Sequence, residues 1–481
     1  MKYQKGELGE IENSNNVKGY LTFSAFSSLR KDTEGIWIRH KRGNGYKPLW
    51  EFLNTKNTGW VIQLDVYGSR LPHGPVYIYY TKDDKGKYTE PRILIVADAN
   101  YHIQSVLGLG LHQSIESSMA LIALEKIESF PGNKKRKKIA HDIALLARLG
   151  DKINNDIELT KKELRFLYEI DSKIESFYHI ADPKKEELKA KRNIKKDLAY
   201  IFGCKEENIG TNITDFDTNK IIYYYGSLEW EKDFVPDTFK DLKRIIGGAS
   251  FPNLTSAAGL NNLQQVDGAY FSSLTNAEGL NNLRNIRGGA IFSNLIYAKG
   301  LNNLRNISAQ ASFPKLTNAE GLNNLQYIGN YAIFTSLKSA KGLNSLKYIG
   351  EDANFSSLIS AQGLDSLQNI VGEADFSSLP EATGLNNLKN IGEHAGFPNL
   401  INAKGLDSLQ NIGGIAYFPK LITAQGLENL QHIGGYADFG SLINAGSLYN
   451  LKYIGRRFDF RSLTSTKGLE NINIDYMDSN R

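Results

Sequence analysis

The residues that could perform catalysis or bind a metal are scattered along this 481-residue sequence. Its eight histidines include no H-x-x-x-H pair, and a single cysteine, Cys204, cannot build a zinc site of the usual kind. Cys204 follows Gly203 at a predicted helix end, where the helix dipole raises the thiol pKa, so we interpret it as a packing residue. P-loop spacing is absent. The motifs therefore predict no cofactor, no metal and no catalytic residue.

A fold can still gather polar residues that sequence spacing does not reveal. Six such residues stand near the ends of predicted strands in the N-terminal region: Arg39, His40, Asp65, Arg92, Asp98 and His112. The alternative interpretation is that they form surface ion pairs and turns. The sequence leaves the question of an enzyme open and favours a chain without catalytic activity.

Basic residues cluster in two N-terminal segments, whereas the 17 Lys and Arg from Gly247 onward are matched by 17 Asp and Glu. The first cluster is Lys134, Lys135, Arg136, Lys137 and Lys138, and the second is Lys184, Lys185, Lys189, Lys191, Arg192, Lys195 and Lys196. Such clusters can bind nucleic acid. Acidic residues are interleaved with them, so solvated helix faces are the favoured interpretation and a nucleic-acid partner is the alternative.

These side chains must be positioned by a chain whose second half repeats itself. Phenylalanines recur every 21 residues at Phe271, Phe292, Phe313, Phe334, Phe355, Phe376, Phe397, Phe418, Phe439 and Phe460, with Phe251 one step of 20 before them. A fixed period of this length is typical of a solenoid, in which each unit buries its apolar side against its neighbours. Terminal units need caps, and Trp230, Phe239, Leu242, Ile245 and Ala249 fit the repeat frame when it is carried back.

Each unit is predicted to contain one strand and one turn. The alternation of Ala332 and Phe334 predicts a strand of about four residues, and Gly-Leu-x-x-Leu-x-x-Ile predicts a single helical or 3₁₀ turn. The glycine before each turn, such as Gly321, is expected to take a conformation closed to other residues. Ser447 replaces it once, so that coil is expected to be strained.

The run from Ile328 to Gly350, I-G-N-Y-A-I-F-T-S-L-K-S-A-K-G-L-N-S-L-K-Y-I-G, resembles the bacterial BspA-type leucine-rich repeat. The cadence of Gly426 to Gly435 is similar to receptor L-domain repeats. The resemblance covers residues 251–475 and implies a right-handed leucine-rich solenoid used for recognition. This chain departs from the usual BspA unit, which is somewhat longer.

The remaining sequence divides into three regions. Residues 1–114 are predicted to form a small mixed α/β module, with a hairpin of Val76 to Tyr80 and Arg92 to Val96. Residues 115–210 are predicted to hold three or four helices, one of them opened by Pro183 and closed by Gly203. Residues 211–250 cap the solenoid of residues 251–475. The expected fold class is an α+β module followed by a leucine-rich solenoid with a parallel sheet.

The first region has a second, sparser resemblance. Trp37-x-Arg39, Tyr77-Ile78-Tyr79, Pro91-Arg92-Ile93 and Gly108 with Gln113 resemble a module in bacterial mobile-element proteins of the PcfJ-like group. The resemblance implies a bacterial or phage origin and supplies no mechanism.

Partner binding is expected where the fold does not dictate the residue. The outward positions that flank the inward Ala and Phe of each strand differ from coil to coil, and we call them the strand face. Its candidate partner-binding residues are Tyr331, Asp352, Asn354, Glu373, Asp375, His394, Tyr417, Tyr436, Asp438, Arg457 and Asp459. Acidic side chains among tyrosines are typical of a protein-binding surface, and the alternative is an unselected polar surface. The recurring pairs such as Asn323-Asn324 predict stacked amides that hydrogen-bond along the coils.

Composition limits the setting of this protein. No apolar run approaches the roughly 18 residues of a membrane span, and the N-terminus lacks a signal-like hydrophobic stretch. A lone cysteine favours a reducing, cytoplasmic setting, with secretion by another route left open. We therefore expect a protein that recognises another protein. The alternatives are an effector enzyme that the solenoid targets, or a nucleic-acid binder that uses the basic helices.

Overall fold

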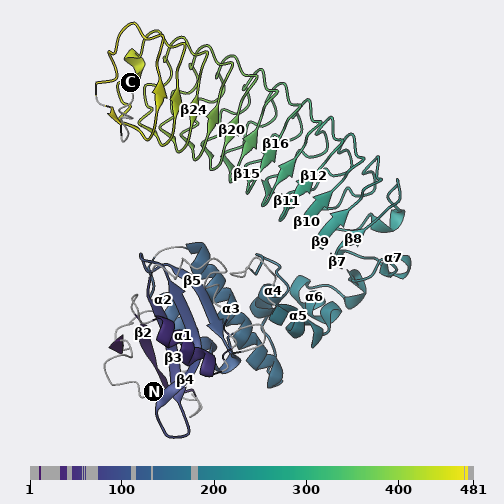
Figure 1. Ribbon diagram of the computed structural model, residues 1–481. Helices are drawn as coiled ribbons and strands as arrows, with labels where there is room; N and C mark the ends of the chain where they lie inside the picture. The colour runs from purple at the N-terminus through teal and green to yellow at the C-terminus, as the bar shows by residue number, and fades with distance from the viewer. Residues whose placement is uncertain are drawn as a thin grey trace. The chain divides into compact units, whose positions relative to one another are not determined.

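The computed structural model describes residues 10–11, 33–40, 46–56, 58, 60, 74–109, 115–131, 134–174, 183–470 and 472–474. The chain divides into two compact units, Met1–Gly203 and Cys204–Arg481, each with its own core. Figure 1 shows strands and helices in the first unit and a stack of coils in the second. The expected fold class, a mixed module followed by a parallel β-solenoid with 21-residue repeats, is confirmed.

The first unit is built on an antiparallel sheet. Its described strands run in the order β1 (Glu10–Ile11), β2 (Gly35–His40), β3 (Val76–Lys82), β4 (Tyr88–Ala97) and β5 (Ile103–Gly108). The predicted hairpin is the β3–β4 pair. The carboxylate of Asp83 closes its turn by accepting hydrogen bonds of 2.9 Å from the N–H groups of Lys85 and Lys87.

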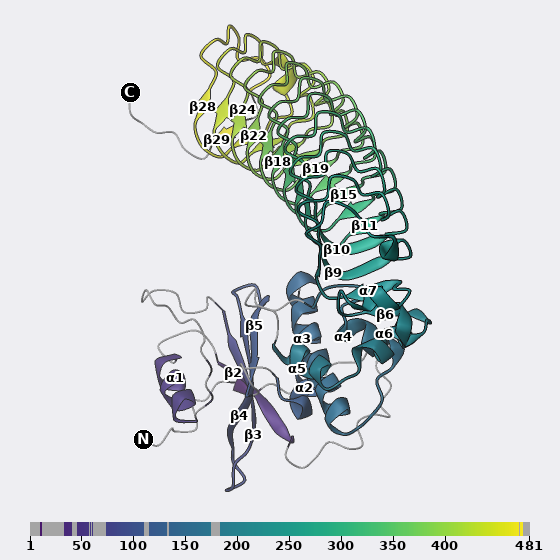
Figure 2. The ribbon, with the colours of Figure 1, turned by 90° about the vertical axis from the view of Figure 1, so that its right-hand side faces the viewer.

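Both faces of this sheet are covered, because neighbouring strand residues point to opposite sides. Ile78 and Leu94 lie in one apolar cluster with residues of α1 (Tyr46–Thr55). Tyr77 and Ile93 lie in another cluster with residues of the later helices. Figure 2 shows α1 on one side of the sheet and α2 and α3 on the other. The sheet is therefore the middle layer of the first unit.

The described helices of region 115–203 outnumber the expected three or four. They are η3 (Ser117–Met119), α2 (Ala120–Glu128), α3 (Lys134–Asn154), α4 (Lys161–Leu167), α5 (Pro183–Ala190) and α6 (Ile194–Phe202). The prediction of one helix from Pro183 to Gly203 is wrong. The chain breaks at Asn193, whose side chain accepts a hydrogen bond from Lys196 N–H and caps α6. Gly203 ends α6 at φ 68°.

The second unit is a ladder of parallel strands that pair with the coils before and after them. Its first elements are η4 (Glu206–Asn208), β6 (Ile209–Gly210), α7 (Asp215–Thr218), β7 (Tyr223–Tyr225), β8 (Leu228–Glu229), η5 (Asp237–Phe239), β9 (Arg244–Ser250) and β10 (Gln265–Tyr270). The two-residue strands that follow are β11 (Asn285–Ile286), β12 (Ala290–Ile291), β13 (Asn306–Ile307), β14 (Ala311–Ser312), β15 (Tyr327–Ile328), β16 (Ala332–Ile333), β17 (Tyr348–Ile349), β18 (Ala353–Asn354), β19 (Asn369–Ile370), β20 (Ala374–Asp375), β21 (Asn390–Ile391), β22 (Ala395–Gly396), β23 (Asn411–Ile412), β24 (Ala416–Tyr417), β25 (His432–Ile433), β26 (Ala437–Asp438), β27 (Tyr453–Ile454), β28 (Phe458–Asp459) and β29 (Asn473–Ile474). Each coil after β10 thus contributes two short strands.

The repeat differs from the predicted unit in where its strands lie. The strand predicted at Ala332 is two residues long. Ile328, which the motif predicts to lie in the turn, belongs to a second strand, β15. In the Gly-Leu-x-x-Leu-x-x-Ile motif, the turn includes the two leucines and not the isoleucine. The N–H of Leu322 donates to Ala319 O and that of Leu325 to Leu322 O, both at 2.9 Å, so the segment is two consecutive i→i+3 turns.

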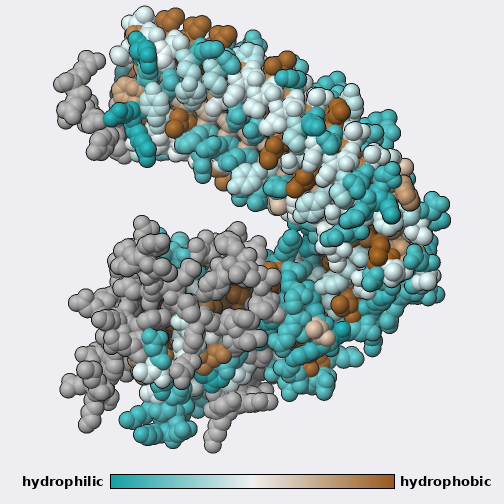
Figure 3. All heavy atoms as spheres, turned by 45° about the vertical axis from the view of Figure 1, so that its right-hand side comes forward, coloured by the Kyte–Doolittle hydropathy of each residue, from teal (hydrophilic) through white to brown (hydrophobic). Residues whose placement is uncertain are grey.

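The interior of the coils is apolar and continuous. The repeated phenylalanine rings stack from Phe251 to Phe460 with centroids 5.0–5.5 Å apart and planes within 14°. The repeated leucines from Leu254 to Leu451 are fully buried beside them. Figure 3 shows the outer surface of the coils as mostly polar, with some apolar side chains among the polar ones. Each coil therefore buries its apolar residues against the next coil rather than within itself.

The turn glycine is required at its position. Gly321 has φ +112°, and a Cβ there would lie 2.2 Å from the carbonyl oxygen of Ala298 in the preceding coil. The strain expected at Ser447 is relieved by a different backbone. That coil forms the 3₁₀ helix η6 (Gly446–Leu448), and Ser447 does not take a positive φ.

The asparagine pairs hydrogen-bond along the coils, but not through stacked amides. The second asparagine of a pair donates to a backbone carbonyl of the coil before it, as Asn324 Nδ2 does to Asn302 O at 2.6 Å and Asn303 Nδ2 to Asn281 O at 2.7 Å. The predicted acceptor was therefore wrong. These amides satisfy carbonyl groups that the turns leave open.

The solenoid core begins before Phe251. Phe216 stacks on Tyr224 at 5.7 Å and contacts Phe239 at 4.4 Å between ring centroids, and all three are buried in the same cluster as the repeat. Trp230 packs against this cluster from its edge. The elements from β6 to η5 therefore cover the first coil with apolar side chains.

Among the described residues, no helix combines the length and the apolar character that crossing a membrane requires.

Phe355→Ala is expected to destabilise the solenoid by about 3 to 5 kcal/mol, because the stacked neighbours Phe334 and Phe376 hold the cavity open. Hydrogen exchange should show lost protection in the adjacent coils as well. Phe458→Ala is the matched control, since Phe458 is 47% exposed and should have a small effect. Equal protection in both variants would contradict the role of the stack.

A fragment of residues 251–481 is expected to aggregate more than one of residues 204–481. Its first coil would expose the apolar surface that Phe216, Tyr224 and Phe239 cover in the whole unit. Light scattering of the two fragments at equal concentration measures the difference. Equal solubility would show that these residues are not needed as a cap.

Candidate protein-binding surface

Arg39, Arg92 and Asp98, three of the polar residues proposed for a fold-built catalytic site, each have a local partner of their own. Arg39 Nη2 donates to Tyr101 Oη at 2.7 Å, and Arg92 forms a two-pronged ion pair with Glu116 at 2.9 Å. Asp98 accepts hydrogen bonds from the N–H groups of Asn100 and His102 in a turn. Asp65 and His112 lie outside the described residues. In the part of the chain that the structure describes, no group of His, Cys, Asp and Glu could hold a metal.

His40 is a buried histidine of β2. Its side chain is 7% exposed, and Nε2 lies 3.5 Å from Tyr80 Oη. Burial lowers the pKa of His40 to about 4, because the charged imidazolium would lose its hydration. His40 is therefore neutral in the folded protein at physiological pH. Cys204 is half-buried, and burial raises its thiol pKa.

The second basic cluster is largely neutralised within the first unit. Lys185 and Lys189 are buried, with their Nζ atoms 2.9 and 3.9 Å from a carboxylate oxygen of Glu169. Arg192 Nε lies 2.6 Å from a carboxylate oxygen of Asp197, which also accepts a hydrogen bond from Tyr168. These pairs hold α4, α5 and α6 together. The contacts of the second basic cluster therefore favour a role in helix packing over nucleic-acid binding.

The first basic cluster opens α3. Lys138 pairs with Asp142 at 2.6 Å one turn along the helix, and Lys137 donates to the carbonyl of Glu128 at 3.4 Å. The side chains of Lys135 and Arg136 lie outside the described residues. The described contacts therefore explain Lys137 and Lys138 as parts of the packing around α3.

The strand face lies on two columns that the ladder holds in register. The residues just before the buried alanines form the first column, and their backbone carbonyls accept hydrogen bonds from the preceding coil, as Asp352 does from Ala332 N–H at 2.8 Å. The second residues of the paired strands form the second column, in which Asn354 pairs with Asp375 and Tyr417 with Asp438. All the predicted face residues are exposed or half-buried: Tyr331, Asp352, Asn354, Glu373, Asp375, His394, Tyr417, Tyr436, Asp438, Arg457 and Asp459.

Three residues in successive coils are linked on this face. Asp352 Oδ1 accepts a hydrogen bond of 2.8 Å from the N–H of Glu373, and Glu373 Oε1 lies 3.7 Å from His394 Nε2. His394 Nδ1 accepts a hydrogen bond of 2.9 Å from the N–H of Ile415 in the next coil. These contacts fix Asp352 and His394 in place and leave Glu373 at the surface between them.

Several predicted face residues also support the backbone. Asn354, Asp375, Asp438 and Asp459 each accept a hydrogen bond of 2.9–3.1 Å from the N–H two residues later. This Asx turn explains an Asn or Asp at that position without any partner. Arg461 also pairs with Asp459 and lowers the pKa of that carboxyl. The second column therefore has a structural role that the sequence prediction missed, although the Asn or Asp that recurs just before the buried phenylalanine signals it.

The face also has acidic residues that we did not predict. A hydrogen bond to Glu351 raises the pKa of Tyr331, and the charges of Glu351, Asp352 and Glu393 raise it further. Burial followed by the charges of Asp438 and Asp459 raises the pKa of Tyr436. Glu351 and Glu393 stand beside the first column, at a corner between two strands that the one-strand unit did not contain. The negative field is therefore stronger than the predicted residues alone provide.

The sign of this field is consistent along the face. The two columns and the corner residues before them hold no Lys or Arg from Asn330 to Asp438. Tyr331 and Tyr417 are 43% and 42% exposed at the borders of the acidic coils, while Tyr436 is half-buried. The arrangement offers carboxylates to a cationic group and exposed aromatic rings to its apolar surroundings.

Compared with known protein families, the sequence matches no family model, and no curated protein matches it. The BspA-type and PcfJ-like resemblances therefore remain expectations.

Lowering the pH from 7 to 4.5 is expected to reduce the free energy of unfolding of the first unit by about 2 to 3 kcal/mol through His40. The depressed pKa means that this stability is complete above the unfolded pKa of 6.5 and is lost as pH falls toward 4, where only the unfolded chain takes up the proton. Urea unfolding followed by tryptophan fluorescence measures the change.

His40→Gln should lose this step in the pH dependence, because it removes the titrating group. His141→Gln is the matched control and should retain it, since His141 is exposed on α3. The same pH dependence in all three proteins would show that His40 is not its source.

Proposed function

We propose that this chain is a recognition protein that binds a protein partner with a basic surface through the strand face. The carrying observation is the run of carboxylates, uninterrupted by Lys or Arg, between exposed tyrosines on coils held in fixed register. Electrostatic complementarity favours a basic partner by speeding association and rejecting acidic competitors. Exposed tyrosines are residue types that commonly carry interface energy.

The frame behind the face supports this proposal. The strand pairs from Ala332 to Ala437 keep the same register in each coil, so the backbone presents nearly the same geometry repeatedly. Differences between coils then reside in the side chains alone. A rigid surface binds with little cost from ordering its own loops.

The carboxylates of the strand face also bear on the two alternative functions, nucleic-acid binding and catalysis. A nucleic acid would be repelled by the carboxylates of Asp352 and Glu373, and the described basic residues Lys185, Lys189 and Arg192 are engaged in ion pairs. No described cluster favours catalysis in the first unit. Protein recognition is therefore the function that the described contacts support best.

The proposal extends to the setting of the protein. We propose a leucine-rich repeat protein of the BspA type, from a bacterium, phage or mobile element, acting in a reducing, cytoplasmic compartment. Its basis is the Gly-Leu-x-x-Leu-x-x-Ile repeat, the sparse PcfJ-like residues and the lone Cys204.

Replacing Tyr331, Tyr417 and Tyr436 with Ser is expected to weaken partner binding by about 1 to 3 kcal/mol per anchoring residue without unfolding the coils. Affinity capture on the full chain, compared with the triple variant, identifies the proteins that depend on these rings. Tyr200→Ser with Tyr449→Ser is the matched control, because both tyrosines are exposed and stand outside the strand face.

Replacing Glu351, Glu373 and Glu393 with Lys should chiefly slow association, and added salt should mask the difference. These residues are preferred to Asp352 and Asp375, whose side chains also hold backbone N–H groups. The association rate with the captured partner is measured at low and high salt. If both the Tyr→Ser and the Glu→Lys triple variants bind the partner as the parent does, and their circular dichroism spectra show that the coils are folded, the strand face is not the binding site.

A further inference from the structure

A third column of the solenoid carries a recurrent side-chain cap. The side chains in it accept a hydrogen bond from the N–H two residues later, just before the turn glycine. This bond is made by Asn276, Asn318, Ser339, Asn402, Thr423, Asn444 and Ser465. Parallel bridges between successive coils hold the column in register. In most coils the position therefore holds a short Asn, Ser or Thr side chain for structural reasons, and Tyr297 and Glu381 are the exceptions.

Tyr297 and Glu381 both depart from this pattern, and Tyr297 is the one with an aromatic side chain. Tyr297 pairs with Asn276 on one side and Asn318 on the other, so its backbone keeps the register. Its long side chain cannot make the cap, and its ring is 57% exposed. The coil thus gives up a hydrogen bond and places an aromatic surface in water. A local rule broken without a structural gain marks a candidate functional position.

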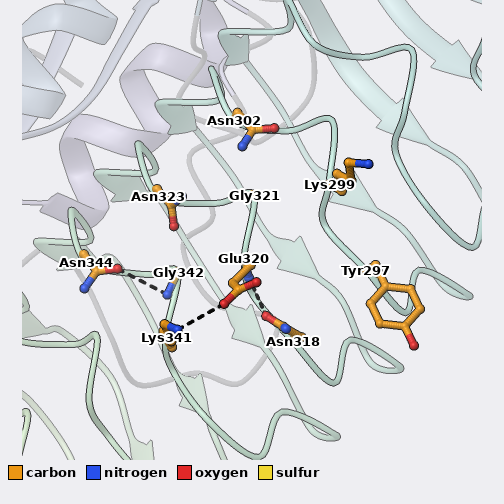
Figure 4. Close-up of a pocket in the computed structure, with 10 residues that line it drawn as sticks. All are labelled: Tyr297, Lys299, Asn302, Asn318, Glu320, Gly321, Asn323, Lys341, Gly342 and Asn344. Atoms are coloured by element: carbon orange, nitrogen blue, oxygen red, sulfur yellow. Dashed lines mark hydrogen bonds and ion pairs between the residues drawn. The ribbon is translucent and has the colours of Figure 1, made fainter.

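Tyr297 borders a groove of about 510 Å³ across three coils. Figure 4 shows Tyr297 at one end, Glu320 and Lys341 in the middle, and Asn302, Asn323 and Asn344 along the far side. The volume is in the range of small-molecule sites. The groove is open, so it suits a ligand that lies along the coils rather than one that is enclosed.

The three asparagines offer donors to the groove at each coil. The side-chain oxygens of Asn302 and Asn344 accept hydrogen bonds of 3.2 Å from the N–H groups of Gly300 and Gly342. Their NH₂ groups are then the part of each amide left for a ligand. Successive donors are separated by one strand spacing, about 4.8 Å, which is close to the length of one pyranose ring.

The charges of the groove cancel. Lys341 Nζ lies 3.3 Å from Glu320 Oε1, and Lys299 Nζ lies 2.6 Å from Glu278 Oε1. A polyanion or a strongly basic peptide would have to break these pairs. The groove therefore fits an uncharged, hydroxyl-rich ligand, to which Glu320 offers acceptors and the amides and lysines offer donors.

We propose that the groove at Tyr297 binds a neutral oligosaccharide. The apolar face of a pyranose ring lies on the exposed tyrosine ring, and its hydroxyl groups exchange hydrogen bonds with Glu320 and with the amides of successive coils. This site uses none of the strand-face residues. The oligosaccharide proposal can therefore be tested independently of the proposed protein partner.

The test measures binding of cellotetraose, maltotetraose and chitotetraose to the full chain by saturation-transfer NMR and titration calorimetry. At least one of them is expected to bind, and Tyr297→Asn should weaken it by about tenfold or more. Because Asn restores the cap made by Asn276 and Asn318, this variant should unfold at the same temperature as the parent or higher. Loss of binding therefore cannot come from loss of folding.

Tyr449→Asn is the control, since Tyr449 is equally exposed and does not line the groove. It should leave oligosaccharide binding unchanged. Glu320→Gln should weaken binding, because it replaces a carboxylate acceptor by an amide of the same shape. The proposal is overturned if none of the three oligosaccharides binds, if Tyr297→Asn binds as the parent does, or if a sulfated oligosaccharide binds more tightly than the neutral ones.

Discussion

The structure of the second unit depends on the fixed 21-residue register between neighbouring coils. Strand residues hydrogen-bond to the adjacent coils, and Phe334 is buried only because Phe313 and Phe355 lie above and below it. A coil without neighbours would have neither its backbone hydrogen bonds nor its core. Stability is therefore a property of adjacent pairs of coils, and the polar surface can vary as long as the buried positions do not.

This constraint also divides the polar surface into two kinds of residue. Asn324, Asp375 and Asn318 satisfy backbone groups that the turns leave open, and their identity follows from the fold. Glu373 and Tyr417 have no such backbone duty, and their identity is free to encode recognition. A predicted binding residue is therefore informative only after its own hydrogen bonds have been considered. By this criterion, Tyr331, Glu373 and Tyr417 are stronger evidence for recognition than Asp352, Asp375 and His394.

The sequence predicted the features that repeat and missed those set by tertiary contacts. The column of Phe355 and the positive φ of Gly321 follow from period and residue type, and both are present. The second strand at Tyr327–Ile328 was missed because leucine and isoleucine three apart fit a turn equally well, and only pairing with β17 distinguishes them. The contribution of Glu351 to the acidic face was missed for the same reason, since it stands at the corner that this extra strand creates. The break at Asn193 was missed because Pro183 and Gly203 are a typical start and end of a single helix, and the sequence between them is compatible with a continuation of that helix.

Departures from a repeat are informative according to whether the structure compensates for them. Ser447 lacks the turn glycine, but the chain forms η6 there and buries Leu448, so the departure is absorbed by the backbone. The 20-residue step before Phe271 is absorbed by a register shift between β9 and β10, which falls between Val266 and Gly268. Tyr297 has no such compensation, because its coil keeps the normal register and loses a cap, and Glu381 loses the same cap in a later coil. In a repeat whose core is invariant, uncompensated departures are where selection for something other than folding is visible.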